Sequence, residues 1–171
     1  MNVLVVVDMQ NDFISGALGT AEAVAIVPAV AEKLARCRRA GDGIFFTRDT
    51  HTPDYLQTQE GAFLPVPHCI RGTPGWEISP ALSVADATVI DKPTFGSLAL
   101  AEAIAGLEGV ERVTLIGVCT DICVLSNAIL LKARLPETPI CVDAACCAGV
   151  TPESHRNALS AMALCQVTVE G

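Results

Sequence analysis

Six short apolar runs, separated by segments with helical periodicity, limit most strongly what this chain can fold into. The first run, residues 3–7, has no polar position, which is typical of a strand buried on both faces. The others are residues 44–47, 88–91, 113–116, 140–142 and 166–169. Helices are predicted over residues 22–39, 97–105, 125–133 and 152–164. This alternation predicts an α/β fold with a six-stranded parallel sheet and helices on both faces.

Several details of this pattern are expectations that a structure can check. In the first helix, Val24, Val27, Ala31, Leu34 and Ala35 are predicted to face the sheet. Thr151 is a predicted N-cap for the last helix, with a proline after it. Residues 143–149 are predicted to form a loop. Residues 52–80, rich in proline and aromatic side chains, are predicted to be long, irregular and functional.

Length and composition restrict the class of protein. The 171 residues predict one domain spanning residues 1–171. The net charge of −8 argues against nucleic acid or an anionic membrane as a partner. The first apolar run ends at Asp8 and has no basic lead, so no signal peptide is expected, and no apolar stretch could span a bilayer. We therefore expect a cytoplasmic protein.

Eight cysteines occur, but none forms a C-x-x-C pair. This spacing disfavours thioredoxin-like and zinc-ribbon folds, and reduced thiols that mostly pack in the core are the expected state. Core packing is the interpretation for Cys146 and Cys147, whereas Cys69, next to a histidine, is a candidate for sensitivity to oxidation or metal.

One cysteine is placed differently from the rest. Residues 117–124 join a predicted strand to a predicted helix, with Thr120 or Asp121 as the expected N-cap. Cys123 then lies in the first helical turn, where unpaired backbone N–H groups favour a thiolate. A cysteine in this position is a candidate nucleophile, although a cysteine chosen at random is more often buried filler.

Polar side chains end successive strands on the same edge of the predicted sheet. They are Asp8, Asp49 with His51, Lys92, and Cys123. Carboxyl ends of parallel strands build sites, so these groups can converge on one crevice. Asp8 would accept a proton, Lys92 would favour the thiolate and developing negative charge, and Cys123 would attack. The alternative for a lone strand-end aspartate or lysine is a cap or a solvated charge.

A second group of side chains indicates a metal-binding site. Asp49 and His51 are two residues apart, so in an extended segment their side chains leave on the same side. His68 follows a rigid segment with two prolines. Two histidines and a carboxylate suit Zn²⁺, with Mn²⁺ or Fe²⁺ as alternatives. Histidines that simply make hydrogen bonds within a loop remain the other interpretation.

Several ordered motifs resemble a known family, the isochorismatase-like cysteine hydrolases, and within it the nicotinamidases. They are residues 7–13, 49–51, 67–69, 72–75, Lys92 and 117–124. The resemblance covers nearly the whole chain and implies a Rossmann-type three-layer fold. It also implies a catalytic triad of Asp8, Lys92 and Cys123, a cis peptide between Val118 and Cys119, and an oxyanion hole formed by the N–H groups of Cys119 and Cys123.

The same resemblance implies a divalent metal ion bound by Asp49, His51, Glu60 and His68. Glu60 stands where some nicotinamidases place a glutamate ligand, and the region where others place a third histidine carries Gln57. In that family the ion holds the pyridine nitrogen of the substrate. Phe13, Leu18 and Phe95 match positions that enclose the substrate ring, with Phe63 or Leu64 as a further wall, although ordinary packing explains each equally well.

The expected activity is hydrolysis of nicotinamide, or a similar small aromatic amide, to nicotinate and ammonia through a thioester. The resemblance further implies a role in NAD salvage and a homo-oligomer. The nearest alternative is a metal-free relative that acts on a ureido or carbamoyl amide, or on an isochorismate-like ether. A binding or redox protein that keeps the fold without turnover belongs to a different class, and a catalytically silent scaffold subunit is a third interpretation.

Overall fold

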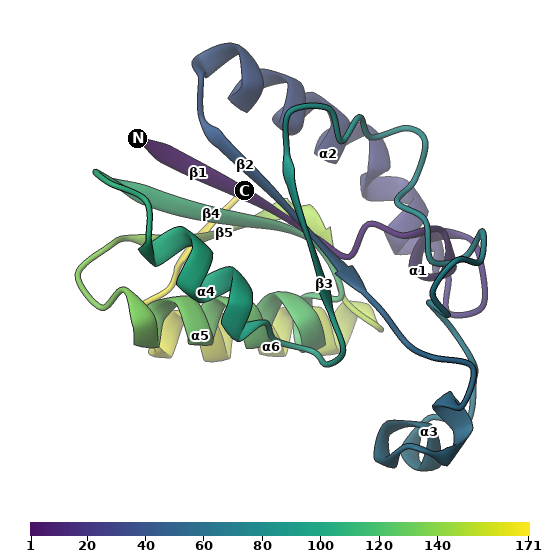
Figure 1. The fold of residues 1–171 in the computed structure, drawn as a ribbon. Helices are drawn as coiled ribbons and strands as arrows, with labels where there is room; N and C mark the ends of the chain where they lie inside the picture. Colours follow the sequence, from purple (N-terminus) through teal and green to yellow (C-terminus); the bar gives the residue numbers. More distant parts are fainter.

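A six-stranded, all-parallel sheet forms the centre of the computed structural model, which describes residues 1–171 (Figure 1). Its strand order is β3-β2-β1-β4-β5-β6. The strands are β1 (Asn2–Val7), β2 (Gly43–Asp49), β3 (Thr88–Lys92), β4 (Arg112–Val118), β5 (Ile140–Ala148) and β6 (Thr168–Glu170). The predicted α/β fold with a parallel sheet is confirmed.

Helices cover both faces of the sheet. The short α1 (Asn11–Ile14) and the long α2 (Ala21–Ala40) lie on one face. The other face carries α4 (Leu98–Ala105), α5 (Leu125–Arg134) and α6 (Pro152–Leu164). Side chains of β1 alternate between the two cores: Val3, Val5 and Val7 pack toward α4, α5 and α6, whereas Leu4 and Val6 pack toward α2. The continuous apolar run thus reflects burial on both faces.

Helix ends follow the local sequence. Thr20, Ser97 and Thr151 cap α2, α4 and α6 by accepting a hydrogen bond from a backbone N–H in the first turn. The Thr151 cap and the following proline are therefore confirmed. Gly41 ends α2 in the left-handed region, with φ of 78°.

Two details of the prediction are wrong. Residues 143–149 are mostly strand, because a register shift between Leu115 and Gly117 lets β5 continue along β4 to Ala148. In α2, Leu34 is buried and Val27 and Ala31 pack against the same core, as predicted, but Val24 and Ala35 are exposed and the other buried positions are Ala23 and Val30. Ala23 packs in the same core as Val30 and Leu34, so the buried face begins one residue earlier than predicted.

The long connection between β2 and β3 contains two short helices, η1 (Tyr55–Gln57) and α3 (Gln59–Phe63), so it is not fully irregular. Figure 1 shows α3 projecting beyond the carboxyl end of the sheet. The chain then returns to the body, where the Trp76 indole donates to Thr50 Oγ1 and Arg48 stacks on its ring. Trp76 therefore anchors this connection. None of the helices combines the length and hydrophobicity needed to cross a membrane.

Candidate active site

Three side chains from separate strand ends meet at the carboxyl edge of the sheet. Lys92 Nζ lies 2.7 Å from Asp8 Oδ2 and 3.6 Å from Cys123 Sγ. All three are shielded from water, with exposed fractions of 0% for Asp8, 1% for Lys92 and 5% for Cys123. Asp8 follows β1 and Lys92 ends β3, so the lysine reaches across the end of β2, which lies between them. The structure brings together the three residues predicted as a triad.

Burial and mutual charge set the protonation of this cluster. Burial raises the pKa of Asp8 above its ordinary value, although the charge of Lys92 opposes the shift. Burial alone would lower the pKa of Lys92, but the charges of Asp8, Cys123 and Asp49 outweigh it and raise that pKa. The ammonium therefore stays charged in the enclosed site.

Burial acts on Cys123 against the effect expected from the helix end and Lys92. Burial and the charge of Asp8 raise the pKa of the Cys123 thiol well above its ordinary value, despite Lys92 nearby. Sequence reasoning weighed the helix end and the lysine but could not weigh the loss of solvent. This direction favours the thiol over the thiolate, so attack by the sulfur calls for a base that takes the thiol proton.

The turn that carries Cys123 differs from the predicted capped α-helix. Residues Thr120–Val124 form a single π-helical turn (η2) that continues into α5. The predicted cap is wrong because both candidate side chains bind elsewhere: Thr120 Oγ1 hydrogen-bonds His155 Nδ1, and the Asp121 carboxylate accepts from Val150 N–H. These contacts tie the turn to the start of α6.

The backbone just before this turn has the conformation implied by the resemblance. The peptide bond between Val118 and Cys119 is cis. The Cys119 N–H donates to no acceptor within the chain, so this predicted oxyanion donor is free.

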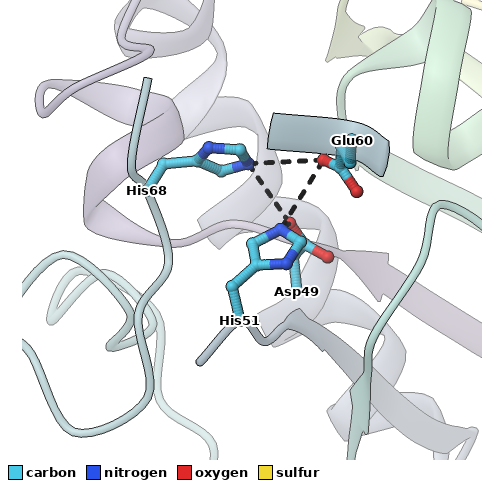
Figure 2. Close-up of side chains that lie close together, drawn as sticks. All are labelled: Asp49, His51, Glu60 and His68. Carbon is cyan, nitrogen blue, oxygen red and sulfur yellow. Dashed lines mark hydrogen bonds and ion pairs between the residues drawn. The ribbon is translucent and has the colours of Figure 1, made fainter. Parts of the chain in front are cut away.

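Four potential metal ligands converge next to the triad (Figure 2). They are Asp49 and His51 from the end of β2, Glu60 from α3, and His68 from the segment after α3. One ligand atom from each lies within 4.8 Å of the others. His51 Nε2 is 2.9 Å from Asp49 Oδ2 and 3.6 Å from Glu60 Oε1, and His68 Nε2 is 3.5 Å from Asp49 Oδ2.

The chemistry of this donor set fits a divalent ion. Two imidazole nitrogens and two carboxylates are the ligands that Zn²⁺, Mn²⁺ and Fe²⁺ accept. His68 Nδ1 lies 2.8 Å from Val66 O, an acceptor that selects the tautomer with Nε2 free to bind metal. The projection of α3 beyond the sheet brings Glu60 to the cluster, so the short helices in this connection have a clear structural role.

Sequence reasoning missed three residues that support the triad and the metal ligands. Gln10 is fully buried, and its amide accepts from Asp49 N–H and donates to Asp49 O. Thr47 Oγ1 donates to Asp8 Oδ1 at 2.7 Å. The Tyr55 ring packs against His51 and His68, with centroid distances of 4.7 and 5.0 Å. The signal available for Thr47 was a polar residue within an apolar strand.

A cavity of about 320 Å³ opens onto both the triad and the group of potential metal ligands. Phe13, Leu18, Leu64 and Phe95 line it, together with Ile122. Cys123, Cys119, Asp49, Glu60 and His68 also line it. The three predicted wall residues and Leu64 therefore surround one space, whereas Phe63 is 84% exposed and lines only an outer hollow.

The remaining cysteines singled out in the sequence lie outside this cavity. Cys69 is fully buried in the core on the α2 face, and its backbone carbonyl accepts from His51 N–H. Cys146 and Cys147 are buried in opposite cores, which agrees with their interpretation as packing residues.

Known proteins are similar to this chain along nearly its full length. Residues 2–170 match the family model described as the isochorismatase domain. The nicotinamidase/pyrazinamidase of Mycobacterium tuberculosis is 30% identical over 190 residues, which cover 95% of this chain and 94% of that protein. The structure of the pyrazinamidase of Pyrococcus horikoshii in complex with zinc superposes with a TM-score of 0.86 at 31% identity, covering 98% and 97% of the two chains. The structure of the pyrazinamidase/nicotinamidase of Streptococcus mutans superposes with a TM-score of 0.87 at 28% identity, covering 99% of each chain.

Proposed function

The chain belongs to the isochorismatase family and is a hydrolase of amide C–N bonds, and we propose that its substrate is nicotinamide or a similar small aromatic amide. The proposed products are nicotinate and ammonia, formed through a thioester on Cys123. The similarity to nicotinamidases and pyrazinamidases over nearly the whole chain supports this substrate class.

The observation that carries the proposal is the shared cavity. Cys123 and three of the four potential metal ligands, Asp49, Glu60 and His68, line one small space with apolar walls. A flat ring held between Phe13 and Phe95 can therefore present one edge to the metal ligands and its amide to the thiol. A substrate that is small, aromatic and substituted with a carboxamide fits both requirements.

The proposed reaction proceeds from groups of the chain. Asp8 takes the proton of the Cys123 thiol, and the sulfur attacks the carbonyl carbon. The N–H groups of Cys119 and Cys123 stabilise the oxyanion, and Lys92 holds the nearby negative charge. Asp8 returns its proton to the amine, the C–N bond breaks and ammonia leaves. Asp8 then takes a proton from water, whose oxygen attacks the thioester to release the acid and restore the thiol.

Asp49, His51, Glu60 and His68 are the residues that would hold a divalent ion. When bound there, such an ion supplies a Lewis acid for a ring nitrogen of the substrate and so orients the amide. Zinc is the ion proposed, which the zinc complex of the Pyrococcus horikoshii pyrazinamidase supports.

The test of the substrate class is ammonia release from four amides: nicotinamide, pyrazinamide, an N-carbamoyl amino acid and a ureidoacrylate. Nicotinamide turnover at least about tenfold above the carbamoyl and ureido compounds is expected, equal to about 1.4 kcal/mol of transition-state discrimination. Preference for a carbamoyl or ureido compound would favour the metal-free alternative. Cys123→Ala should lower turnover by roughly 10³-fold or more. Cys165→Ala is the matched control, since that thiol is exposed at the end of α6.

The test of the metal site uses His51→Ala and Glu60→Ala, with Gln59→Ala as the control. Gln59 is the exposed neighbour of Glu60 on the same short helix. Purified protein is expected to hold about one divalent ion per chain, with binding weakened in both ligand variants and unchanged in Gln59→Ala. Full activity of protein freed of metal by a chelator would contradict the proposed role.

A further inference from the structure

Thr47 is a fully buried threonine on β2 that lies against the carboxylate of Asp8. Its Oγ1 lies 3.3 Å from Asp8 N–H, from which it accepts, and 2.7 Å from Asp8 Oδ1, to which it donates. Because the hydroxyl accepts from the amide, its single proton is left to point at the carboxylate. The backbone reinforces the contact, since Asp8 N–H also donates to Thr47 O at 3.2 Å.

The two oxygens of Asp8 consequently have different environments. Oδ1 is occupied by the Thr47 hydroxyl. Oδ2 is buried and forms the ion pair with Lys92 Nζ at 2.7 Å. Oδ2 thus lies on the side of the ammonium that also contacts the Cys123 sulfur.

We propose that Thr47 is a positioning residue for the proton acceptor: its hydroxyl holds Asp8 Oδ1 and so directs Oδ2 toward Lys92 and the Cys123 thiol. This inference rests on the proposed function, in which Asp8 takes the thiol proton. It adds a fourth residue to the reaction, one that touches neither substrate nor the reacting sulfur. Lys92 cannot replace it, because the ammonium contacts Asp8 through Oδ2 alone and leaves rotation of the carboxylate unopposed on the other side.

Thr47→Val tests the inference because it keeps the branched shape and removes the hydroxyl. The variant is expected to lower kcat for ammonia release by about tenfold, part of the 10²–10⁴-fold that a positioned base contributes, with KM changed less than about twofold. Thr47→Ser restores the hydroxyl without the methyl group and should recover most of kcat. A residue needed only for packing would respond to the loss of the methyl group instead.

Thr114→Val is the matched control. Thr114 lies on β4, which flanks β1 on the side opposite β2. Its hydroxyl accepts only a long bond of 3.4 Å from Arg112 Nε, and it belongs neither to the triad nor to the metal ligands. Its kcat should equal that of the unaltered protein. If Thr47→Val does not fold, Thr47→Ala and Thr47→Ser give the same comparison without a second branch at the buried site.

Crystal structures of Thr47→Val and Thr47→Ser separate failure of this inference from failure of the proposed function. In Thr47→Val the Asp8 carboxylate is expected to rotate or to occupy two orientations, whereas in Thr47→Ser it should keep one. A single unchanged orientation in Thr47→Val, or an unchanged kcat, would overturn the positioning role. Absence of ammonia release by the unaltered protein would reject the substrate class, while the orientation of Asp8 would still decide the role of Thr47.

Discussion

Lys92 and Asp8 form an ion pair at 2.7 Å that is buried away from water and crosses the end of an intervening strand. The same ammonium lies 3.5 Å from Asp49 Oδ1 and 3.1 Å from Thr94 O. It therefore joins the triad to the group of metal ligands, and its positive charge is shared between two carboxylates that would otherwise repel each other.

Lys92→Met is expected to destabilise the fold as well as to abolish activity. Removing one partner leaves Asp8 buried and unpaired, which costs about 3–5 kcal/mol for a pair of this kind. Urea unfolding measures the stability, and ammonia release measures the activity. Arg134→Met is the control, because the Arg134 ion pair with Glu102 has a similar 3.0 Å separation but is exposed and lies outside the site. Its loss should leave the free energy of unfolding nearly unchanged. Equal losses in the two variants would contradict the importance of burial.

The pH dependence of kcat/KM should reflect the buried carboxylate. Asp8 must be ionised to accept the thiol proton, and burial raises its pKa above the ordinary 3.8. Activity is therefore expected to fall as pH decreases through this raised pKa, with the acid limb above pH 3.8. Circular dichroism at each pH excludes unfolding as the cause. An acid limb at or below the ordinary value would show that burial does not control this group.

Gln10→Ala should weaken metal binding rather than proton transfer. The Gln10 amide holds both backbone groups of Asp49, at 2.7 Å from N–H and 2.8 Å to O, and also donates to Trp76 O. Loss of a residue that orients a ligand lowers metal affinity by about 10–100-fold. Competition with a chelator measures the affinity. Asn11→Ala is the control. Asn11 follows Gln10 in the chain, and this change removes only its side-chain hydrogen bond to Pro74 O, so metal affinity should stay unchanged.

The sequence alone was sufficient to predict which strand ends build the site. Asp8, Asp49 and Lys92 each end an apolar run, and parallel topology places such ends on one edge. The supporting residues Thr47 and Gln10 were missed because their partners depend on the register between β1 and β2. In that register Val6 pairs with Phe46, which brings Thr47 beside Asp8. The effect of burial on the Cys123 pKa could not be predicted for a different reason, since desolvation depends on packing that a linear sequence does not reveal.

Gly117→Ala is expected to disrupt the approach of β4 to β1, just before the turn that carries Cys123. Gly117 has φ of 116°, and a Cβ there would lie 2.2 Å from Val7 O, the carbonyl just before Asp8. Because that contact is with backbone, the strands must separate, and a loss of about 3 kcal/mol or more is expected together with loss of activity. Gly109→Ala provides the control, because its φ of 66° is also positive but a Cβ there would meet nothing within 4 Å. That variant should lose only about 1–2 kcal/mol, from the backbone conformation alone, and retain activity. Urea unfolding compares the two, and equal losses would mean that φ, rather than the contact with β1, determines the need for glycine at position 117.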